Sequence, residues 1–442
     1  MPTSAADPTS GTPSQTAKPR RRWYQFTLRT AGVWIALLCL LLGSFAWWRD
    51  RAVRQRKVVE ELRGLGARVD YRYFSQSKWK YIATVDKPQN EFFLCSWLRH
   101  YFGTDFVYDV DSVRVRTSPG LSIIQPESLR LALPLIQKCP RIRLLELEGS
   151  EVSGADLRNL PCLESLEELT LSPASRSVGS HGVLTDGDLV FLERATHLRL
   201  LDLANQPVGD TGLKHLGNCP GLQVLRLRDT NIGDEGLKHL SELTELVRLD
   251  LSHTRISDAG LKYLCNLKQL EELTLRENAI SGEGLAYVGP KPELNFLDAG
   301  NTEFTDDALR HLKQFPKLDA VDLTNTKITG SGIPHLSRLK LRGVCLNGCA
   351  VSDAGIAGIE IPDSWRFFSV ARTTVSDKGF CSLKLPPSME MVLLADTGVT
   401  DASLYHLQFL PNLKCVSVSK TQITREGIQR FLALNPNCKV VD

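Results

Sequence analysis

Histidine recurs at one position of a regular spacing, which makes metal binding the first chemistry to consider. Successive members of this column are 24, 72, 24 and 71 residues apart: His215, His239, His311, His335 and His406. Neutral imidazole is a common ligand of zinc, and two histidines 24 residues apart in a repeat could approach each other. However, no column of carboxylates or thiols accompanies the histidines to complete a four-coordinate site. We therefore expect no metal site and no other bound cofactor.

Aspartate also recurs, in several repeats directly after Ser or Thr, as in Ser257-Asp258, Ser352-Asp353 and Thr400-Asp401. A row of carboxylates is a possible calcium array. The same order of residues is typical of a helix start, where the hydroxyl caps backbone N–H groups and the helix dipole favours a nearby negative charge. We interpret these pairs as helix caps.

Motifs of the main catalytic classes are missing from the sequence. There is no Gly-rich phosphate loop, no nucleophile elbow, no His-Glu-x-x-His and no paired Cys motif. The eleven cysteines have no spacing typical of a disulfide framework or a zinc site. The sequence therefore predicts a protein without enzymatic activity and without catalytic residues.

A pattern of the form Leu-x-Leu-x-x-Thr-x-Ile-x-Asp-x-Gly-Leu-x-x-Leu organises most of the chain, and its clearest copy starts at Leu249. Its first residue recurs mostly every 24 residues: Leu145, Leu169, Leu201, Leu225, Leu249, Leu273, Leu297, Val321, Val344, Phe368, Val392 and Val416. The step from Leu169 to Leu201 holds eight extra residues, which we place in the Ser- and Gly-rich stretch 173–183 as a projecting loop. A period of this length indicates a solenoid of strand-plus-helix units.

Two hydrophobic periods within one unit predict its local structure. Leu249 and Leu251 alternate with polar residues as in a half-buried strand, whereas Leu261 and Leu264 are spaced as on one face of a short helix. Three residues after the second strand leucine stands a short, mostly hydroxyl side chain: Thr230, Thr254, Asn278, Thr302, Thr326, Cys349, Thr373, Thr397 and Thr421. We expect this column to satisfy backbone groups that the sheet leaves unpaired.

The repeated residue pattern resembles that of leucine-rich repeat proteins, in particular the cysteine-containing and ribonuclease-inhibitor-like branch. F-box receptors also belong to this branch. The resemblance covers residues from about 145 to 442, preceded by a degenerate unit. It implies an α/β solenoid with a curved parallel sheet inside and short helices outside. It also implies a binding surface rather than a catalyst.

The exposed side of the predicted strands carries the candidate binding residues. Charged and amide side chains recur between the two strand leucines and just beyond the second one: Asp202, Asn205, Arg226, Asp229, Asp250, His253, Arg276, Glu277, Asp298, Asn301, Asp322 and Asn325. A rigid concave sheet with such groups suits a polypeptide or a glycan, because its side chains lose little conformational freedom on binding. A merely solvated polar face is the alternative interpretation.

The amino-terminal part of the chain is different in composition. Residues 1–19 are rich in Pro, Ser and Thr and predict a disordered tail. Residues 31–48 form a run without charged residues that is just long enough to cross a hydrocarbon core of about 30 Å. A cleaved signal peptide is the alternative, but the run is long for one and lacks a small-residue cleavage site. We therefore expect a single uncleaved transmembrane helix.

The side of the membrane on which the repeats lie is left open by two conflicting observations. Five positive charges between residues 18 and 29 favour retention of the amino end inside and the repeats outside. The odd number of scattered cysteines is more usual for a cytosolic protein. The segments 21–30, 58–63 and 97–103 make the chain similar to membrane-anchored leucine-rich repeat proteins of planctomycete-type bacteria, which implies a membrane-anchored protein of that lineage but no partner. We expect the repeats outside the cytoplasm because of the amino-terminal charges.

The charge of the chain is divided between its two parts. Residues 1–63 hold 11 Lys and Arg against 4 acidic residues, whereas the remainder holds 42 against 46. A basic segment suits an anionic membrane surface, and a mildly acidic repeat region argues against nucleic acid as the ligand.

Four regions follow from these patterns. We predict a tail at 1–19, a transmembrane anchor at 20–50, a juxtamembrane segment with an amino-terminal cap at 51–108, and a repeat domain at 109–442. The aromatic stripe in 90–102 is interpreted as the cap of the first repeat, with a partner site as the alternative. The predicted function is a membrane-anchored, non-catalytic scaffold that binds a protein or glycan. The alternative is a cytoplasmic adaptor or inhibitor of the F-box or ribonuclease-inhibitor type.

Overall fold

The structure is a computed structural model of the 442-residue chain. It describes residues 28–71, 109–116, 126–148, 152–172 and 184–442. The chain divides into two compact units, residues 1–54 and residues 55–442. The predicted tail at 1–19, the aromatic stripe in 90–102 and the inserted loop at 173–183 lie outside the described residues.

The first unit contains most of helix α1, Leu28–Gly64. Large apolar side chains on this helix are exposed, including Leu40 at 71% and Leu41 at 65%. The guanidinium of Arg51 lies 5.4 Å from the ring centre of Trp48. The described residues include no helix that is both long and apolar enough to cross a membrane. Residues 31, 32 and 34 of the predicted span fall outside the described side chains, and the transmembrane helix is not confirmed.

The second unit starts with the last turns of α1, where Val58 and Leu62 join the hydrophobic core. Strand β1, Arg68–Tyr71, pairs antiparallel with β2, Val110–Arg116, and β2 pairs parallel with β3, Leu144–Glu148.

A single sheet of fifteen strands, in chain order, runs through the described part of this unit. All strand pairs after β1–β2 are parallel. The twelve predicted strand positions lie on β3 to β14, and β15 continues the sheet. The strands after β3 are β4 Glu168–Thr170, β5 Leu200–Asp202, β6 Val224–Arg226, β7 Arg248–Asp250, β8 Glu272–Thr274, β9 Phe296–Asp298, β10 Ala320–Asp322, β11 Gly343–Cys345, β12 Phe367–Ser369, β13 Met391–Leu393, β14 Cys415–Ser417 and β15 Lys439–Val441.

Short helices connect the strands, and several are 3₁₀ rather than α-helical. The predicted helix at Leu261–Leu264, for example, is the 3₁₀ helix η4, which suits a return path of few residues. The helices are α4 Pro126–Ile136, α5 Gly154–Arg158, η1 Leu163–Ser165, η2 Asp186–Arg194, η3 Gly212–Asn218, α6 Asp234–Leu240, η4, α7 Leu285–Val288, η5 Asp307–Gln314, α8 Ile333–Leu336, α9 Asp353–Ile356, α10 Asp377–Phe380, α11 Asp401–Leu407 and α12 Arg425–Leu434.

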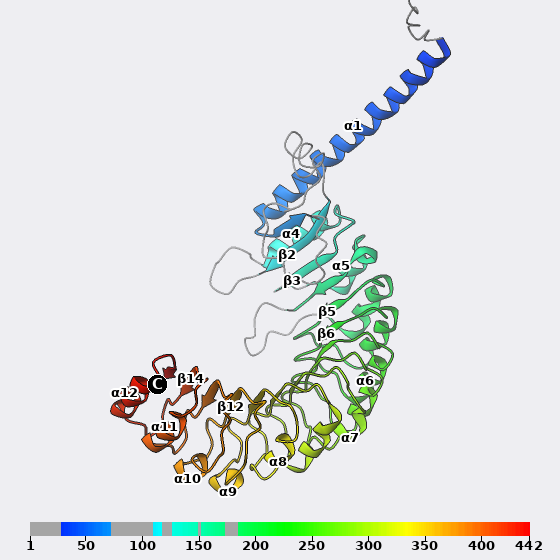
Figure 1. Cartoon of the computed structure of the whole chain (residues 1–442). Coiled ribbons are helices and arrows are strands. Elements are labelled where there is room, and N and C mark those ends of the chain that lie inside the picture. Colours follow the sequence, from blue (N-terminus) through cyan, green and yellow to red (C-terminus); the bar gives the residue numbers. More distant parts are fainter. Residues whose placement is uncertain (1–27, 72–108, 117–125, 149–151, 173–183) are drawn as a thin grey trace, which may run out of the picture. The chain divides into compact units, whose positions relative to one another are not determined.

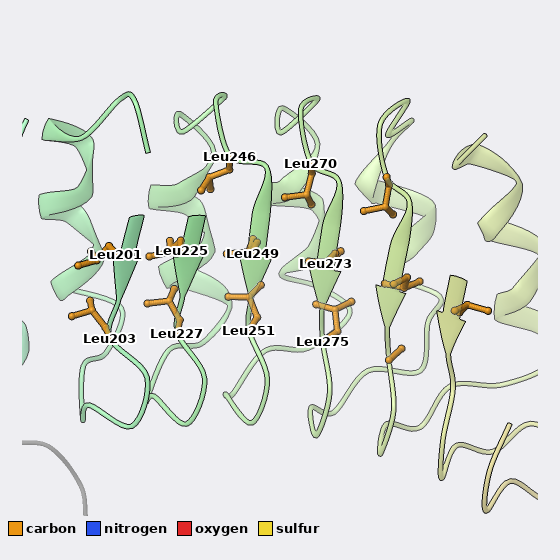
Figure 2. Close-up of a cluster of buried hydrophobic side chains, with 14 of the residues drawn as sticks. Leu201, Leu203, Leu225, Leu227, Leu246, Leu249, Leu251, Leu270, Leu273 and Leu275 are labelled. Carbon is orange, nitrogen blue, oxygen red and sulfur yellow. The ribbon is translucent and has the colours of Figure 1, made fainter. Parts of the chain in front are cut away.

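The repeated leucines form the continuous core that the period predicts. Leu225 lies directly opposite Leu201 and Leu249 in the register of the sheet. Figure 2 shows that the two leucines of each strand point to the same side and stack along the solenoid. Because one repeat cannot bury these side chains by itself, the stacking of neighbours provides the hydrophobic stabilisation. Within the second unit, the strands follow the inner side of an arc and the helices its outer side (Figure 1).

The hydroxyl column has the structural role expected from the sequence. The Oγ1 atom of Thr302 donates to the Ala299 carbonyl at 2.6 Å, and Thr326 and Thr373 make the same bond to Leu323 and Val370. Asn278 donates to the carbonyls of both Leu251 and Leu275, so it joins two repeats. These bonds satisfy buried carbonyls where each strand turns inward.

Candidate binding face

Every second side chain of a strand points away from the core, and the common register aligns these side chains into rows across the sheet. We call the residue before the first core position the leading row, and the residue between the two core positions the middle row. The loop row stands two residues beyond the second core position. The predicted residues of β5 to β10 lie on the last two rows, except Arg276, which lies between them.

Ion pairs connect the carboxylates of the middle row with arginines of nearby repeats. Arg226 lies 3.2 Å from Asp202, and the Nη1 atom of Arg276 lies 3.1 Å from Asp298 and 3.5 Å from Asp322. Burial raises the pKa of Asp298, and the nearby carboxylate of Asp322 adds to this effect, while Gly300 and Arg276 oppose it. One guanidinium thus serves two adjacent carboxylates.

The aspartates of the middle row also hold their own backbone. The Oδ1 atom accepts a bond from the N–H two residues later in all four repeats that carry Asp, at 2.9 to 3.0 Å: Asp202 to Ala204, Asp250 to Ser252, Asp298 to Gly300 and Asp322 to Thr324. This is a common turn geometry for Asp. The conspicuous aspartates of the sequence therefore have a structural function, whatever they contact in solution.

Close approach fixes the position of Arg276. A Cβ atom on Gly300 would lie 2.5 Å from the Nη1 atom of Arg276, so the guanidinium lies directly over this glycine. The position of Gly300 is occupied by Ser252 and Thr324 in other repeats. Arg276 is thus held on the face by its ion pairs and by the space that the missing side chain of Gly300 leaves, a feature that the repeat pattern did not predict.

The loop row has a left-handed backbone throughout. The φ angle is positive, between 50° and 61°, at Asn205, Asp229, His253, Glu277, Asn301, Asn325, Arg372, Asp396 and Lys420. Gly348 has φ 64° at the same position. Asn, Asp and Gly adopt this conformation with the least strain, so much of the row's composition has a backbone cause. His253, Glu277, Arg372 and Lys420 are not explained in this way.

Hydrogen bonds run along the loop row from repeat to repeat. Asn301 donates to Glu277 at 3.4 Å, Asn325 donates to Asn301 at 2.6 Å, and Arg372 reaches past Gly348 to Asn325 at 3.3 Å. The row therefore presents a connected series of amide and charged groups along one edge of the sheet face.

Asp229 is the most heavily engaged carboxylate of the loop row. It contacts His253 in the next repeat and lies 2.9 Å from Arg228. Burial would raise the pKa of Asp229, but hydrogen bonds from His253 and then Arg228 outweigh this effect and lower it. The carboxylate is therefore ionised at neutral pH and fixed in place.

Residues of the leading row were not among the predicted candidates. Arg248 lies 3.2 Å from Glu272 in the next strand, and both side chains are partly exposed. Arg228, the partner of Asp229, was also missed. The strand alternation places Arg248 and Glu272 on the same face as Asp250 and Thr274, so the pattern was sufficient to include them.

Some of the Ser-Asp and Thr-Asp pairs cap their helices, although Ser352 makes no such bond, and several pairs also join adjacent repeats. Ser376 caps α10, as predicted, by accepting a bond from Lys378. Its hydroxyl also donates to Asp353 of the preceding repeat at 2.6 Å, and its N–H donates to the same carboxylate at 2.7 Å. Equivalent bonds join Asp258 to Ser281 and Asp306 to Thr329. We call this series the aspartate ladder, since each carboxylate is bound by the next repeat.

The histidine column lies on the helices, away from the strands. His215 lies 3.2 Å from Glu193, His311 lies 3.3 Å from Glu283, and His406 contacts the Leu383 carbonyl. Within the residues that the structure describes, no three His, Cys, Asp or Glu side chains are close enough to hold a metal ion.

Buried nucleophiles in the core are inaccessible. Lys291 is fully buried and donates to the Val288 carbonyl at 2.8 Å. Burial, and then the positive charge of Lys268, lower its pKa to about 8. Burial raises the pKa of Cys162 to about 12 and that of Cys219 to about 11, so both thiols are protonated at neutral pH. These groups act as core residues.

Comparison with known proteins agrees with the repeat pattern. Residues 218–241 and 243–265 match the family described as Leucine Rich repeat. No curated protein matches the chain significantly.

Among solved structures, an internalin from Listeria monocytogenes has 19% identity and a TM-score of 0.48, over 79% of this chain and 94% of that chain. A leucine-rich repeat protein from Leptospira interrogans has 15% identity and a TM-score of 0.39, over 70% of this chain and 92% of that chain.

The assignment therefore rests on the matched repeats and on the observed register. The resemblances to the ribonuclease-inhibitor-like branch and to planctomycete-type proteins stay predictions. Two repeats match the family directly, and the same 24-residue register continues from β5 to β10 on both sides of them. Residues 218–265 are therefore leucine-rich repeats, and the strands on both sides of them keep the same register.

Proposed function

We propose that this protein is a non-catalytic scaffold that binds a polypeptide partner on the sheet face from β5 to β10. One observation carries the proposal: charged and amide side chains stand there in rows that ion pairs and backbone bonds hold in place. Because these side chains are already held in place, little conformational freedom is lost when a partner binds, and more of the contact energy becomes affinity. Leucine-rich repeat folds commonly serve as protein-binding scaffolds.

The charges of this face favour a partner with exposed basic groups. The three rows and Arg276 hold seven acidic side chains from β5 to β10: Asp202, Asp229, Asp250, Glu272, Glu277, Asp298 and Asp322. They hold three arginines, Arg226, Arg248 and Arg276, and Arg228 adds a fourth at the position equivalent to Arg276. An excess of carboxylates repels phosphate backbones, which argues against nucleic acid. A neutral glycan would be the second ligand class to test.

Membrane attachment through residues 31–48, with the repeats outside the cytoplasm, is a further part of the proposal. The exposed apolar side chains of α1 and the arginine beside Trp48 support it, since such groups are stable in lipid and at its interface. The described part of helix α1 does not support membrane attachment by itself, because no span within it is long and apolar enough to cross a membrane.

The site is tested by cross-linked capture of partners from cells that express the full-length chain. The test variants are Glu277→Lys and Arg248→Glu, because both side chains are exposed. Asp250 and Asp298 are not changed, since their carboxylates also accept hydrogen bonds from backbone N–H groups. Each should reduce recovery of a specific polypeptide at least tenfold. Glu245→Lys is the matched control, an exposed glutamate outside the rows. Equal recovery with all variants would contradict the assignment.

Topology is tested separately with an epitope tag after Asp442 and protease treatment of intact cells. Loss of the tag, with a cytoplasmic protein preserved, is the expected result. A tag that is protected until the cells are lysed would contradict the extracytoplasmic placement and favour a cytoplasmic adaptor.

A further inference from the structure

The excess negative charge of the binding face is confined to four strands. On β5 and β6, the three rows and the position of Arg276 hold equal numbers of acidic residues and arginines: Asp202, Asp229, Arg226 and Arg228. On β7 to β10 they hold five acidic residues and two arginines: Asp250, Glu272, Glu277, Asp298, Asp322, Arg248 and Arg276. On β11 to β14 basic residues prevail: Asp396, Arg372 and Lys420. The unbalanced carboxylates therefore lie within about 14 Å along the sheet, at the usual strand spacing.

Within these four strands, Arg276 is shared among three carboxylates. Its Nη1 atom lies 3.1 Å from Asp298 and 3.5 Å from Asp322, and its Nε atom lies 3.9 Å from Glu277. We call Asp298 and Asp322 the paired aspartates, because they lie directly opposite each other in the register of β9 and β10. The side chain of Asp322 is the more exposed of the two, at 28% against 15%. One guanidinium does not neutralise this group.

The paired aspartates have a cation on one side only. Arg276 approaches them from the side of Gly300, where the missing side chain leaves room for its guanidinium. Two residues earlier on each strand, and therefore on the same face, stand Phe296 and Ala320. Both are partly buried and uncharged. A second cation can therefore approach the carboxylates from the side of the leading row.

Phe296 places an aromatic ring beside these carboxylates. Glu272 lies directly opposite it on β8, and Asp298 follows it on the same face of β9. None of the cations that lie over aromatic rings in the described part of the chain lies over Phe296. The face of an aromatic ring attracts a cation, and the planar guanidinium of arginine stacks on it. The ring and the carboxylates together suit an arginine side chain.

We propose that Phe296 and the paired aspartates anchor an arginine side chain of the polypeptide that binds the sheet face. This inference rests on the proposed function and adds which side chain of the partner is recognised, and where. The guanidinium stacks on Phe296 and donates to Asp322, while its aliphatic stem lies over Ala320. Lysine fits less well, because an ammonium group neither stacks nor donates through a planar fork. The partner segment is basic, and about four extended residues cover β7 to β10.

The test is fluorescence-polarisation titration of the purified full-length chain with three labelled nine-residue peptides. They differ only at the central residue, which is arginine, lysine or the uncharged isostere citrulline, and each has one lysine on either side among serines. The arginine peptide should bind at least fivefold more tightly than the other two. Phe296→Ala should weaken its binding about fivefold by removing the ring. Asp322→Asn should weaken it by a similar factor, since asparagine keeps the oxygen that accepts the Thr324 N–H but loses the charge.

Two matched variants make the result specific. Phe367→Ala removes a partly buried ring of the same row on β12, outside the acidic strands. Asp396→Asn removes an exposed carboxylate of the loop row beyond β10. Both should leave binding of the arginine peptide unchanged, and thermal unfolding checks that each variant is folded. Equal affinities of the arginine and citrulline peptides, or equal losses in Phe296→Ala and Phe367→Ala, would overturn the proposal.

Failure of the anchor is distinguishable from failure of the proposed function. If partner capture depends on Glu277 but the arginine peptide shows no preference, the face remains the binding site and the anchor is wrong. If capture is the same for all face variants, the proposed function is wrong. In that second case, a preference for the arginine peptide that Phe296→Ala and Asp322→Asn abolish would still support the anchor.

Discussion

Gly260 shows how closely single residues of adjacent repeats approach each other. A Cβ atom on Gly260 would lie 2.2 Å from the Oδ1 atom of Asp234 in the preceding repeat. Gly260→Ala must therefore displace that carboxylate from Ser257, and we expect it to lower the free energy of unfolding by about 1–3 kcal/mol. Urea unfolding followed by circular dichroism measures the change.

Gly217→Ala provides the matched control for that substitution. Its Cβ would have no neighbour within 4 Å, and Gly217 lies in the short helix η3. We expect a change within about 0.5 kcal/mol of zero. Equal effects of the two substitutions would contradict the close packing of glycine against aspartate.

The aspartate ladder connects successive helix starts at the scale of elements. Burial would raise the pKa of Asp353, but hydrogen bonds from Ser376 and Gly379 outweigh this and lower it. Because the folded-state pKa is below the unfolded one, the stabilisation is present above about pH 4 and is lost as the pH falls through the folded value. Asp353→Asn should be less stable than the wild type at pH 7, and this difference should shrink towards pH 3 in urea midpoints.

Asp396→Asn is the control for the ladder. Asp396 is exposed, and its carboxylate has no hydrogen-bond or ion-pair partner in the described part of the chain. Its replacement should leave the pH dependence of the wild type unchanged. A constant difference between Asp353→Asn and the wild type from pH 7 to pH 3 would show that the ladder carboxylate does not stabilise through its charge.

At the scale of the whole molecule, the constant register implies that complete repeats are interchangeable units. Deleting residues 237–260 removes 24 residues and joins Gly236 to Leu261, which restores the Asp-Glu-Gly-Leu order of a helix start. We expect this variant to fold with lower stability and a smaller denaturant slope, since one unit of buried surface is lost. Deletion of only residues 249–260 breaks the register and should abolish cooperative unfolding. Retained cooperativity in the shorter deletion would contradict this account.

Much of the fold was predictable because its signals are local and repeated. The positions of Leu201 to Val416 fixed the strands, and Thr302 and its equivalents fixed the turns, because each repeat must solve the same packing problem. The helix type was less predictable. Leu261 and Leu264 have spacing compatible with both an α- and a 3₁₀-helix, and the available path length decides between them.

The sequence by itself determined the solenoid, its core and the rows that face outward, since period and alternation are properties of the chain. Only the tertiary structure decided which groups meet. It placed Arg276 over Gly300, bound Asp353 to the next repeat and gave the loop row its left-handed backbone. It also aligned Phe296 with Phe367 across Gly343. The physical reason is that these contacts join residues in different repeats or depend on φ, and neither spacing nor residue type specifies a side chain's direction across a gap between repeats.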